Sequence, residues 1–300
     1  MTNQTLWQRV KAQTEYARQC GALKSIPTEY ELIEQNGVNF FVRIVTNLIR
    51  KEQAKKQQDK KSAKQGKAFN PFLPYEEDLF VADLSETHVC LLNKFNVVDH
   101  HLLIITRGFE AQKNLLTSAD FTALWHCFTE INGFGFYNGG ADAGASQRHK
   151  HLQVVPLPLI PDGTSVPIQA AIANATFQDN IGKLGIFPFQ HALIRLDWDE
   201  STEIDKIAQQ TLNAYHQLLD AVKIEGSDGY FGEQTQAYNL LITREWMLIV
   251  PRSQGSYQQI AINSLGIGGA MLVRSREQLE QLKAISPFKI LEQVTVQDSN

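Results

Sequence analysis

The segment Phe136–Pro158, FYNGGADAGASQRHKHLQVVPLP, contains the most informative pattern in the chain. It ends in LQVVPL, an apolar run of the kind that forms a strand. In an extended strand, alternate side chains lie on the same face. We therefore expect His149, His151 and Gln153 to share one face of this strand, with Lys150 on the other.

A glycine-rich stretch precedes the two histidines. Four glycines between Gly135 and Gly144 allow the backbone to approach a ligand closely and expose its amide N–H groups, as loops that hold phosphate do. Asn138 and Ser146 add neutral hydrogen-bond donors to the same stretch. The sequence therefore predicts a phosphate-binding loop beside the histidine strand.

The row of two histidines and a glutamine predicts a nucleophilic imidazole. A neutral imidazole attacks phosphorus well, and a covalent phosphoramidate divides one displacement into two easier steps. The second ring nitrogen must meet the partner histidine or a main-chain carbonyl, which fixes the tautomer. Gln153 can donate a hydrogen bond to a phosphate oxygen but cannot transfer a proton at neutral pH. The site therefore suits a leaving group that is itself a phosphate.

A metal centre is the main alternative for two histidines at this spacing. Asp142 is a possible third ligand, but Cys20, Cys90 and Cys127 lie far apart and form no CxxC pair. Their odd number also argues against a disulfide framework, which favours the cytoplasm as the location of the protein. We expect no protein-bound metal.

Composition and charge exclude several classes of protein. The chain has 300 residues, of which 43% are hydrophobic, and 28 basic against 32 acidic residues give a net charge of −4. A polycation built for nucleic acid is therefore excluded. The seven lysines between Lys51 and Lys67 are interpreted as a solvent-exposed loop, because no aromatic residues alternate with them. No signal peptide and no membrane-spanning run is expected.

Along the rest of the chain, strands follow one another through short turns, and helices stand between the groups of strands. Apolar spacing predicts helices over 4–22, 118–132 and 204–222 and from Ser275 onward, the last with a capping box to Gln278. Strands are predicted at 39–49, 87–94, 97–107, 152–157, 238–243, 246–251, 260–265 and 270–274. Pro156 and Pro158 place the strand at 152–157 at an edge of a sheet or end it. This order favours an α+β fold with a largely antiparallel sheet and flanking helices.

The stretch 161–190 shows no clear period and is rich in Pro, Gly and Asn. We interpret it as a long connection between two parts of the chain. The N-terminal catalytic region, 1–165, contains the His-x-His-x-Gln motif, and the C-terminal region covers 185–300.

Asn138, Ser146 and the segment His149–Gln153 resemble the histidine triad superfamily, in the nucleotidyltransferase branch where glutamine replaces the third histidine. More closely, the chain is similar to the ATP adenylyltransferase family, also called diadenosine tetraphosphate phosphorylases. The likeness covers most of the chain and includes NPFLPYEEDL (70–79), NKFNVVDHHLLIITR (93–107), YNLLITREWMLIVP (238–251) and NSLG (263–266). It implies a histidine-triad-like fold and makes 185–300 the C-terminal ATP adenylyltransferase region.

The resemblance implies that inorganic phosphate cleaves diadenosine 5',5'''-P1,P4-tetraphosphate to ATP and ADP, in a reversible adenylyl transfer. His151 would carry AMP covalently, His149 would orient the ring or its main chain, and Gln153 would hold phosphate oxygens. The other residues implied to bind substrate are Asn93, Lys94, Asn138, Gly144, Ala145, Ser146, Gln147, Asn263, Ser264 and Leu265. One basic residue among Arg43, Lys51 and Lys55 should join them. Magnesium or manganese is expected with the polyphosphate.

Alternative functions remain open from the sequence. A uridylyltransferase of the same superfamily shares the triad pattern, although many of those enzymes have paired cysteines at a zinc site. A hydrolase of the superfamily would cleave without phosphate. A nucleotide- or RNA-binding protein that uses the lysines of 51–67 is a different class, and it would not need His151 and Gln153 on one face. We interpret His100, His101 and His191 as structural, with one of the first two facing inward from a strand.

Overall fold

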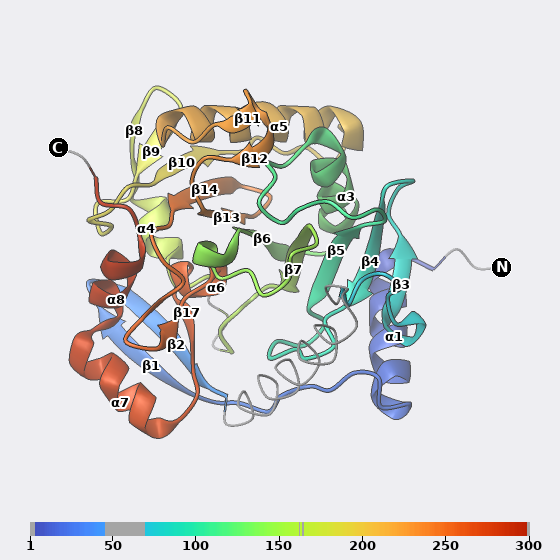
Figure 1. Cartoon of the computed structure of the whole chain (residues 1–300), viewed down its shortest axis with the longest axis horizontal. Helices are drawn as coiled ribbons and strands as arrows, with labels where there is room; N and C mark the ends of the chain where they lie inside the picture. The colour runs from blue at the N-terminus through green and yellow to red at the C-terminus, as the bar shows by residue number, and fades with distance from the viewer. Residues whose placement is uncertain (1–3, 46–69, 162, 164, 299–300) are drawn as a thin grey trace, which may run out of the picture.

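The computed structural model describes residues 4–45, 70–161, 163 and 165–298 (Figure 1). Its centre is a ten-stranded sheet in which each strand is antiparallel to its neighbours. The spatial order is β3 (Phe80–Asp83), β4 (His88–Leu92), β5 (Leu102–Thr106), β7 (His151–Pro156), β6 (Gly133–Gly139), β13 (Tyr238–Ile242), β14 (Trp246–Pro251), β10 (Ala192–Arg195), β9 (Ile181–Lys183) and β8 (Thr176–Gln178). The predicted α+β class with a largely antiparallel sheet is confirmed.

The two parts of the chain join inside this sheet. Strand β6 pairs with β7 on one side and with β13 on the other, where Asn138 lies opposite Asn239. Strands that precede residue 160 lie on one side of this junction, and strands that follow it lie on the other (Figure 1). The junction therefore brings the glycine-rich stretch into contact with the C-terminal part.

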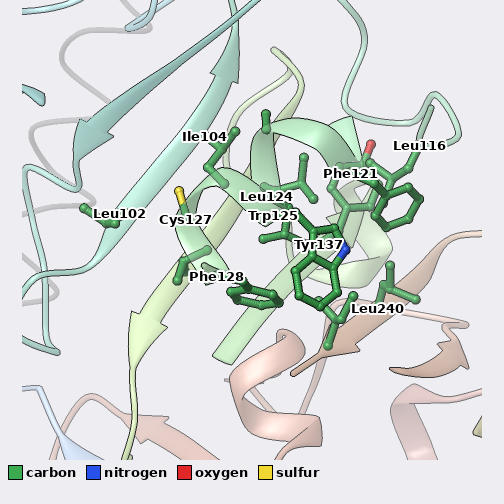
Figure 2. Close-up of a cluster of buried hydrophobic side chains, with 14 of the residues drawn as sticks. Leu102, Ile104, Leu116, Phe121, Leu124, Trp125, Cys127, Phe128, Tyr137 and Leu240 are labelled. Atoms are coloured by element: carbon green, nitrogen blue, oxygen red, sulfur yellow. The ribbon is translucent and has the colours of Figure 1, made fainter. Parts of the chain in front are cut away.

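Helices pack on one face of the sheet. They are α1 (Leu6–Gln19), α3 (Ser118–Phe128) and α5 (Ile204–Ala221), and their apolar side chains share one core with the sheet. Figure 2 shows part of it, in which Phe121 and Trp125 of α3 gather with Tyr137 and Leu240 of the two central strands. Helix α3 begins at a capping box between Thr117 and Asp120. Burial of these large aromatic side chains stabilises the layered arrangement.

A second layer covers the opposite face. It consists of a three-stranded sheet, ordered β1 (Glu29–Gln35), β2 (Val38–Ile44) and β17 (Ala270–Val273), and of α6 (Ser264–Ile267), α7 (Arg276–Ile285) and α8 (Pro287–Val294). Phe40, Phe134 and Trp246 lie in the core between the layers. Strand β2 corresponds to the strand predicted at 39–49, of which residues 46–49 lie outside the described residues, as does the lysine-rich stretch 51–67.

Two predicted strands are wrong in extent. The segment 97–107 becomes β5 only at Leu102, because residues 93–101 form a loop in which His100 adopts a left-handed backbone with φ 55°. The strand predicted at 260–265 is limited to β16 (Ile260–Ala261), because the side chain of Asn263 accepts from the N–H of Gly266 and starts α6. In both places a local side-chain or backbone preference ends the extended chain.

The connection predicted over 161–190 contains three short elements, namely α4 (Gln169–Ala173), β8 and β9. They are too short to produce a readable period. The other elements of the described residues are η1 (Glu77–Leu79), η2 (Ala141–Ala143), β11 (Gly226–Asp228), β12 (Phe231–Gln234) and β15 (Ser256–Tyr257).

Other boundary predictions are resolved by hydrogen bonding. Strand β7 lies between β5 and β6 and ends at Pro156, so the proline ends a central strand and the edge alternative is wrong. Ser275 caps α7 by accepting from the N–H of Gln278, but the side chain of Gln278 accepts from the N–H of Arg274, so the capping box is incomplete. Among the described residues, no helix is both long and apolar enough to cross a membrane.

Candidate active site

The histidine pair lies where β7 begins. His151 is opposite Ile105 of β5, Gln153 is opposite Leu103, and the ring of Phe72 lies 5.5 Å from the ring centroids of both His149 and His151. His149 precedes the strand and is held by an isolated bridge to Ala111. The two imidazoles therefore share one face, as the alternation predicts.

The ring of His151 has a defined tautomer. Its Nδ1 lies 2.9 Å from the main-chain oxygen of His149. Because a carbonyl oxygen only accepts, Nδ1 carries the proton and Nε2 is the unprotonated nitrogen. Burial lowers the pKa of His151 to about 4, so the ring is neutral at physiological pH. The geometry therefore gives His151 a neutral ring with an unprotonated Nε2, which are the two properties that the predicted role requires.

His149 is fixed through both of its ring nitrogens. The side chain of Asn70 accepts from the N–H of Phe72 at 3.0 Å, so its amide nitrogen donates to Nδ1 of His149 at 2.9 Å. Nε2 of His149 then donates to the main-chain oxygen of Thr106 at 2.8 Å. The fixed His149 residue carries the carbonyl that sets the tautomer of His151. Sequence reasoning missed Asn70 and Thr106, and the Asn-Pro-Phe triplet at 70–72 was the available signal.

Gln153 is oriented by a short chain of hydrogen bonds. The side-chain oxygen of Asn93 accepts from the N–H of Phe95 at 3.3 Å, and its amide nitrogen donates to Nδ1 of His101 at 3.2 Å. Nε2 of His101 donates in turn to the side-chain oxygen of Gln153 at 2.9 Å. The amide N–H₂ group of Gln153 is therefore the end directed away from this chain. His101 lies in the loop before β5, so its predicted placement inside a strand is wrong.

Asn138 is oriented from the C-terminal part. Its side-chain oxygen accepts from the Oγ of Ser264 at 2.8 Å, from the N–H of Ser264 at 2.9 Å and from the amide of Asn239 at 2.9 Å. Arg252 donates through Nη1 to the side-chain oxygen of Asn239 and through Nε to the main-chain oxygen of Val294. With its oxygen occupied by these donors, Asn138 can offer only N–H groups to a ligand.

Comparisons with known proteins agree with this arrangement. A family model described as "Ap4A phosphorylase N-terminal domain" matches residues 1–174, and one described as "ATP adenylyltransferase C-terminal domain" matches residues 186–297. The chain belongs to the Ap4A phosphorylase family. This family assignment confirms the resemblance that the triad segment and the segments 70–79, 93–107, 238–251 and 263–266 indicated.

Relatives of the Ap4A phosphorylase family cover nearly the whole chain. Diadenosine 5',5'''-P1,P4-tetraphosphate phosphorylase 2 of Saccharomyces cerevisiae is 29% identical to this chain in an alignment 308 residues long. The alignment covers 94% of this chain and 91% of the yeast protein. The crystal structure of yeast Ap4A phosphorylase Apa2 superposes with a TM-score of 0.76 at 26% identity, over 100% of this chain and 97% of the yeast chain. A structure of Apa2 in complex with AMP gives 0.77 at 25% identity, over 100% and 99%.

In this member of the Ap4A phosphorylase family, the glycine-rich stretch touches the C-terminal part. Gly144 has φ 90°, and a Cβ at this position would lie 2.8 Å from the main-chain oxygen of Ile262. A side chain there would be strained and would collide with the segment before α6. Ala145, Ser146 and Gln147 continue this stretch toward His149, and Ser146 is exposed.

The remaining predicted substrate residues are divided between accessible and buried positions. Ser264 is fully buried and Leu265 is 5% exposed, so the hydroxyl of Ser264 meets Asn138 rather than solvent. Lys94 is partly exposed and forms an ion pair with Glu76. Arg43 donates to the main-chain oxygen of Val97 at 3.0 Å, whereas Lys51 and Lys55 lie outside the described residues.

The opposite face of β7 carries a buried ion pair. Nζ of Lys150 lies 2.7 Å from Asp120, and both side chains are 1% exposed. Burial raises the pKa of the Asp120 carboxyl, but the charge of Lys150 and the hydrogen bond from His88 hold it well below its usual range. The predicted opposite orientations of Lys150 and the histidines are confirmed. No group of three His, Cys, Asp or Glu side chains arranged for a metal ion occurs among the described residues.

Proposed function

We propose that the protein is a nucleotidyltransferase that phosphorolyses diadenosine tetraphosphate to ATP and ADP through AMP bound covalently to His151. The carrying observation is the hydrogen bond from Nδ1 of His151 to the main-chain oxygen of His149, at 2.9 Å. It leaves Nε2 unprotonated in a ring that burial keeps neutral. The buried His191 has the same ring hydrogen bond, but its Nε2 accepts from the main-chain N–H of Leu184 at 2.8 Å, as expected of a structural histidine.

The first step forms a bond between Nε2 of His151 and the α-phosphorus of the substrate. The bond from that phosphorus to the bridging oxygen breaks, and its electron pair leaves with ATP. In the second step, an oxygen of inorganic phosphate attacks the same phosphorus, the P–N bond breaks and ADP leaves. Neither leaving group requires a proton from the protein, which agrees with glutamine rather than histidine at position 153.

The oriented amides of Gln153 and Asn138 stabilise the negative charge on the reacting phosphoryl group. Each presents N–H groups because its oxygen is already occupied. Such preorganised donors act most strongly where charge develops in the transition state. Lys94 supplies positive charge from the accessible side of the loop, and magnesium or manganese accompanies the polyphosphate. Removal of divalent cations by a chelator should stop the reaction, and added magnesium should restore it.

The test is the dependence of cleavage on phosphate. The protein is incubated with diadenosine tetraphosphate and magnesium, with and without inorganic phosphate, and the nucleotides are separated by anion exchange. ATP and ADP that form only with phosphate support phosphorolysis. ATP and AMP formed without phosphate would instead identify a hydrolase, and absence of cleavage would favour a uridylyltransferase or a binding protein.

A further inference from the structure

The pairing between β6 and β7 ends before it reaches Asn138 on β6 and His151 on β7. The antiparallel register runs from Gly133 opposite Pro156 to Phe136 opposite Gln153. Continued by two residues, the same register would place Asn138 opposite His151. The strands do not pair there, and the side chain of Gln112 lies between them instead.

Gln112 replaces the missing strand-to-strand hydrogen bonds. Its Oε1 accepts from the main-chain N–H of His151 at 2.8 Å, and its Nε2 donates to the main-chain oxygens of Asn138 at 2.9 Å and His151 at 3.2 Å. Only one orientation of the Gln112 amide can donate to both main-chain oxygens and accept from the main-chain N–H of His151. A carboxylate lacks the donors, and an apolar side chain lacks every partner.

The main chain of Gln112 is itself held in place. Its N–H donates to the oxygen of Arg148 at 2.8 Å, and its oxygen accepts from the hydroxyl of Tyr137 at 2.5 Å. The residue is 3% exposed. A side chain fixed at its base and bonded to both strands acts as a spacer of constant length.

We propose that Gln112 is a positioning residue that sets the separation between the nucleophilic His151 and the phosphate-binding amide of Asn138. The inference rests on the proposed function, because it gives the spacer a role in the chemical step. A displacement of about 1 Å at a reacting centre can cost about 100-fold in rate. Loss of the spacer therefore affects the formation of the adenylyl-enzyme more than the binding of nucleotide.

The first variant is Gln112→Met, which keeps the length of the side chain and removes its hydrogen bonds. Its kcat for phosphorolysis should fall about 100-fold, whereas its KM should stay within about twofold of wild type. A single-turnover measurement of AMP attachment to the protein should show the same loss. The matched control is Gln190→Met, because Gln190 donates one side-chain hydrogen bond to the main-chain oxygen of Val222 in the C-terminal part. The control should keep the wild-type rate.

Gln112→Glu tests the amide itself and remains informative if the methionine variant does not fold. A protonated carboxyl group can donate to one main-chain oxygen and accept from His151, whereas a carboxylate faces those oxygens with negative charge. The rate of this variant relative to wild type should therefore increase as the pH is lowered from 8 to 6. The titratable groups around position 112, which are His149, His151, Tyr137 and Glu110, belong to both proteins, so the ratio to wild type removes the pH dependence that the two proteins share.

The outcomes separate the two proposals. An inactive wild-type protein overturns the proposed function and this inference with it. With an active wild type, the folded Gln112→Met variant decides: a kcat about 100-fold lower supports the spacer, and an unchanged kcat overturns the spacer alone. Where the methionine variant does not fold, the Gln112→Glu variant decides: a ratio that increases toward acid supports the spacer, and a pH-independent ratio overturns it.

Discussion

The two side-chain amides near His151 are oriented by networks from different parts of the molecule. Gln153 is held by His101 and Asn93, which lie in one loop of the N-terminal part. Asn138 is held by residues of the C-terminal part, which reach it across the junction of β6 and β13. In both networks the amide oxygen is occupied, so the nitrogen becomes the end that a phosphate can meet. The comparison shows that the N–H₂ group of a side-chain amide is oriented when hydrogen bonds occupy the oxygen of the same amide.

The networks also differ in burial. Arg252 and Asn239 are fully buried, and burial lowers the pKa of Arg252 to about 10. Asn93 and Gln153 are only partly buried. Polar groups that lose their partners in a dry interior cost more than those near water. We therefore expect the C-terminal network to support both stability and catalysis, and the loop network to support mainly catalysis.

The largest effect should come from removing the group that both networks serve. The His151→Ala variant should lose phosphorolysis by a factor on the order of 10⁶, the size of loss produced when a covalent nucleophile is removed. Its nucleotide binding should largely survive, as measured by calorimetry with AMP. His126→Ala, which changes a histidine near the end of α3, is the control with wild-type rate. Phosphorolysis by the His151→Ala protein at more than a few per cent of wild type would exclude the covalent mechanism.

The next effect tests the buried network. Arg252→Met removes the donors to Asn239 and to the main-chain oxygens of Val294, Gln254 and Ile262. The free energy of unfolding should fall by about 3 kcal/mol or more, because each buried acceptor left without a partner costs about 1–3 kcal/mol. The kcat should also fall, by about 100-fold, as Asn138 loses its orientation. Urea unfolding and steady-state kinetics measure the two losses.

A control for Arg252 is Arg195→Met, at an exposed arginine that lies over the ring of Phe177. It should change neither stability by more than about 0.5 kcal/mol nor the rate. If Arg252→Met lowers stability without slowing the folded enzyme, the link from the C-terminal part to Asn138 is not used in catalysis.

In the loop network we expect a similar loss of rate but a smaller loss of stability. His101→Leu removes the donor to the oxygen of Gln153, so that the amide can turn its oxygen toward the phosphate. The kcat should fall about 100-fold, as for loss of one preorganised donor, with little change in stability. The neighbouring His100→Asn is the matched control, since asparagine tolerates the left-handed backbone found there. Equal rates for the two variants would show that His101 does not act through Gln153.

The sequence predicts which side chains of one strand lie together in this site, but it does not predict the distant residues that orient them. Alternation along one strand is a two-residue period, so the order of amino acids alone assigns His149, His151, Gln153 and the opposite Lys150 to their faces. The orientation of Asn138 depends on Arg252, which lies more than a hundred residues away in the chain. No periodicity relates such distant positions, because their contact follows from the register of β6 with β13.

The errors in the fold have a similar cause. Val97 and Val98 precede the apolar run of β5 and so extend the strand pattern backward, yet the left-handed backbone at His100 ends the extended conformation. That error placed His101 on a strand face and hid its contact with Gln153. Gln112 gave no signal at all, because an isolated glutamine in a loop has no pattern. Its role arises only where two strands separate in three dimensions.

The smallest effect on the rate is expected where a histidine from each part of the chain is compared through its effect on stability. His191 repeats the arrangement of His151, since its Nδ1 lies 2.7 Å from the main-chain oxygen two residues earlier, and burial lowers the pKa of each to about 4. The unfolded chain binds protons on both rings near pH 6.5, so it holds more protons than the folded protein between pH 6.5 and 4. Stability should therefore be complete above this window and fall by about 3 kcal/mol per histidine as the pH decreases through it. His149, His100 and His216 also have lowered pKa values and add to the loss in both proteins. Urea unfolding of His191→Gln should therefore show a loss smaller than that of wild type by about 3 kcal/mol at unchanged activity, and a loss equal to that of wild type would mean that His191 is not neutral in the fold.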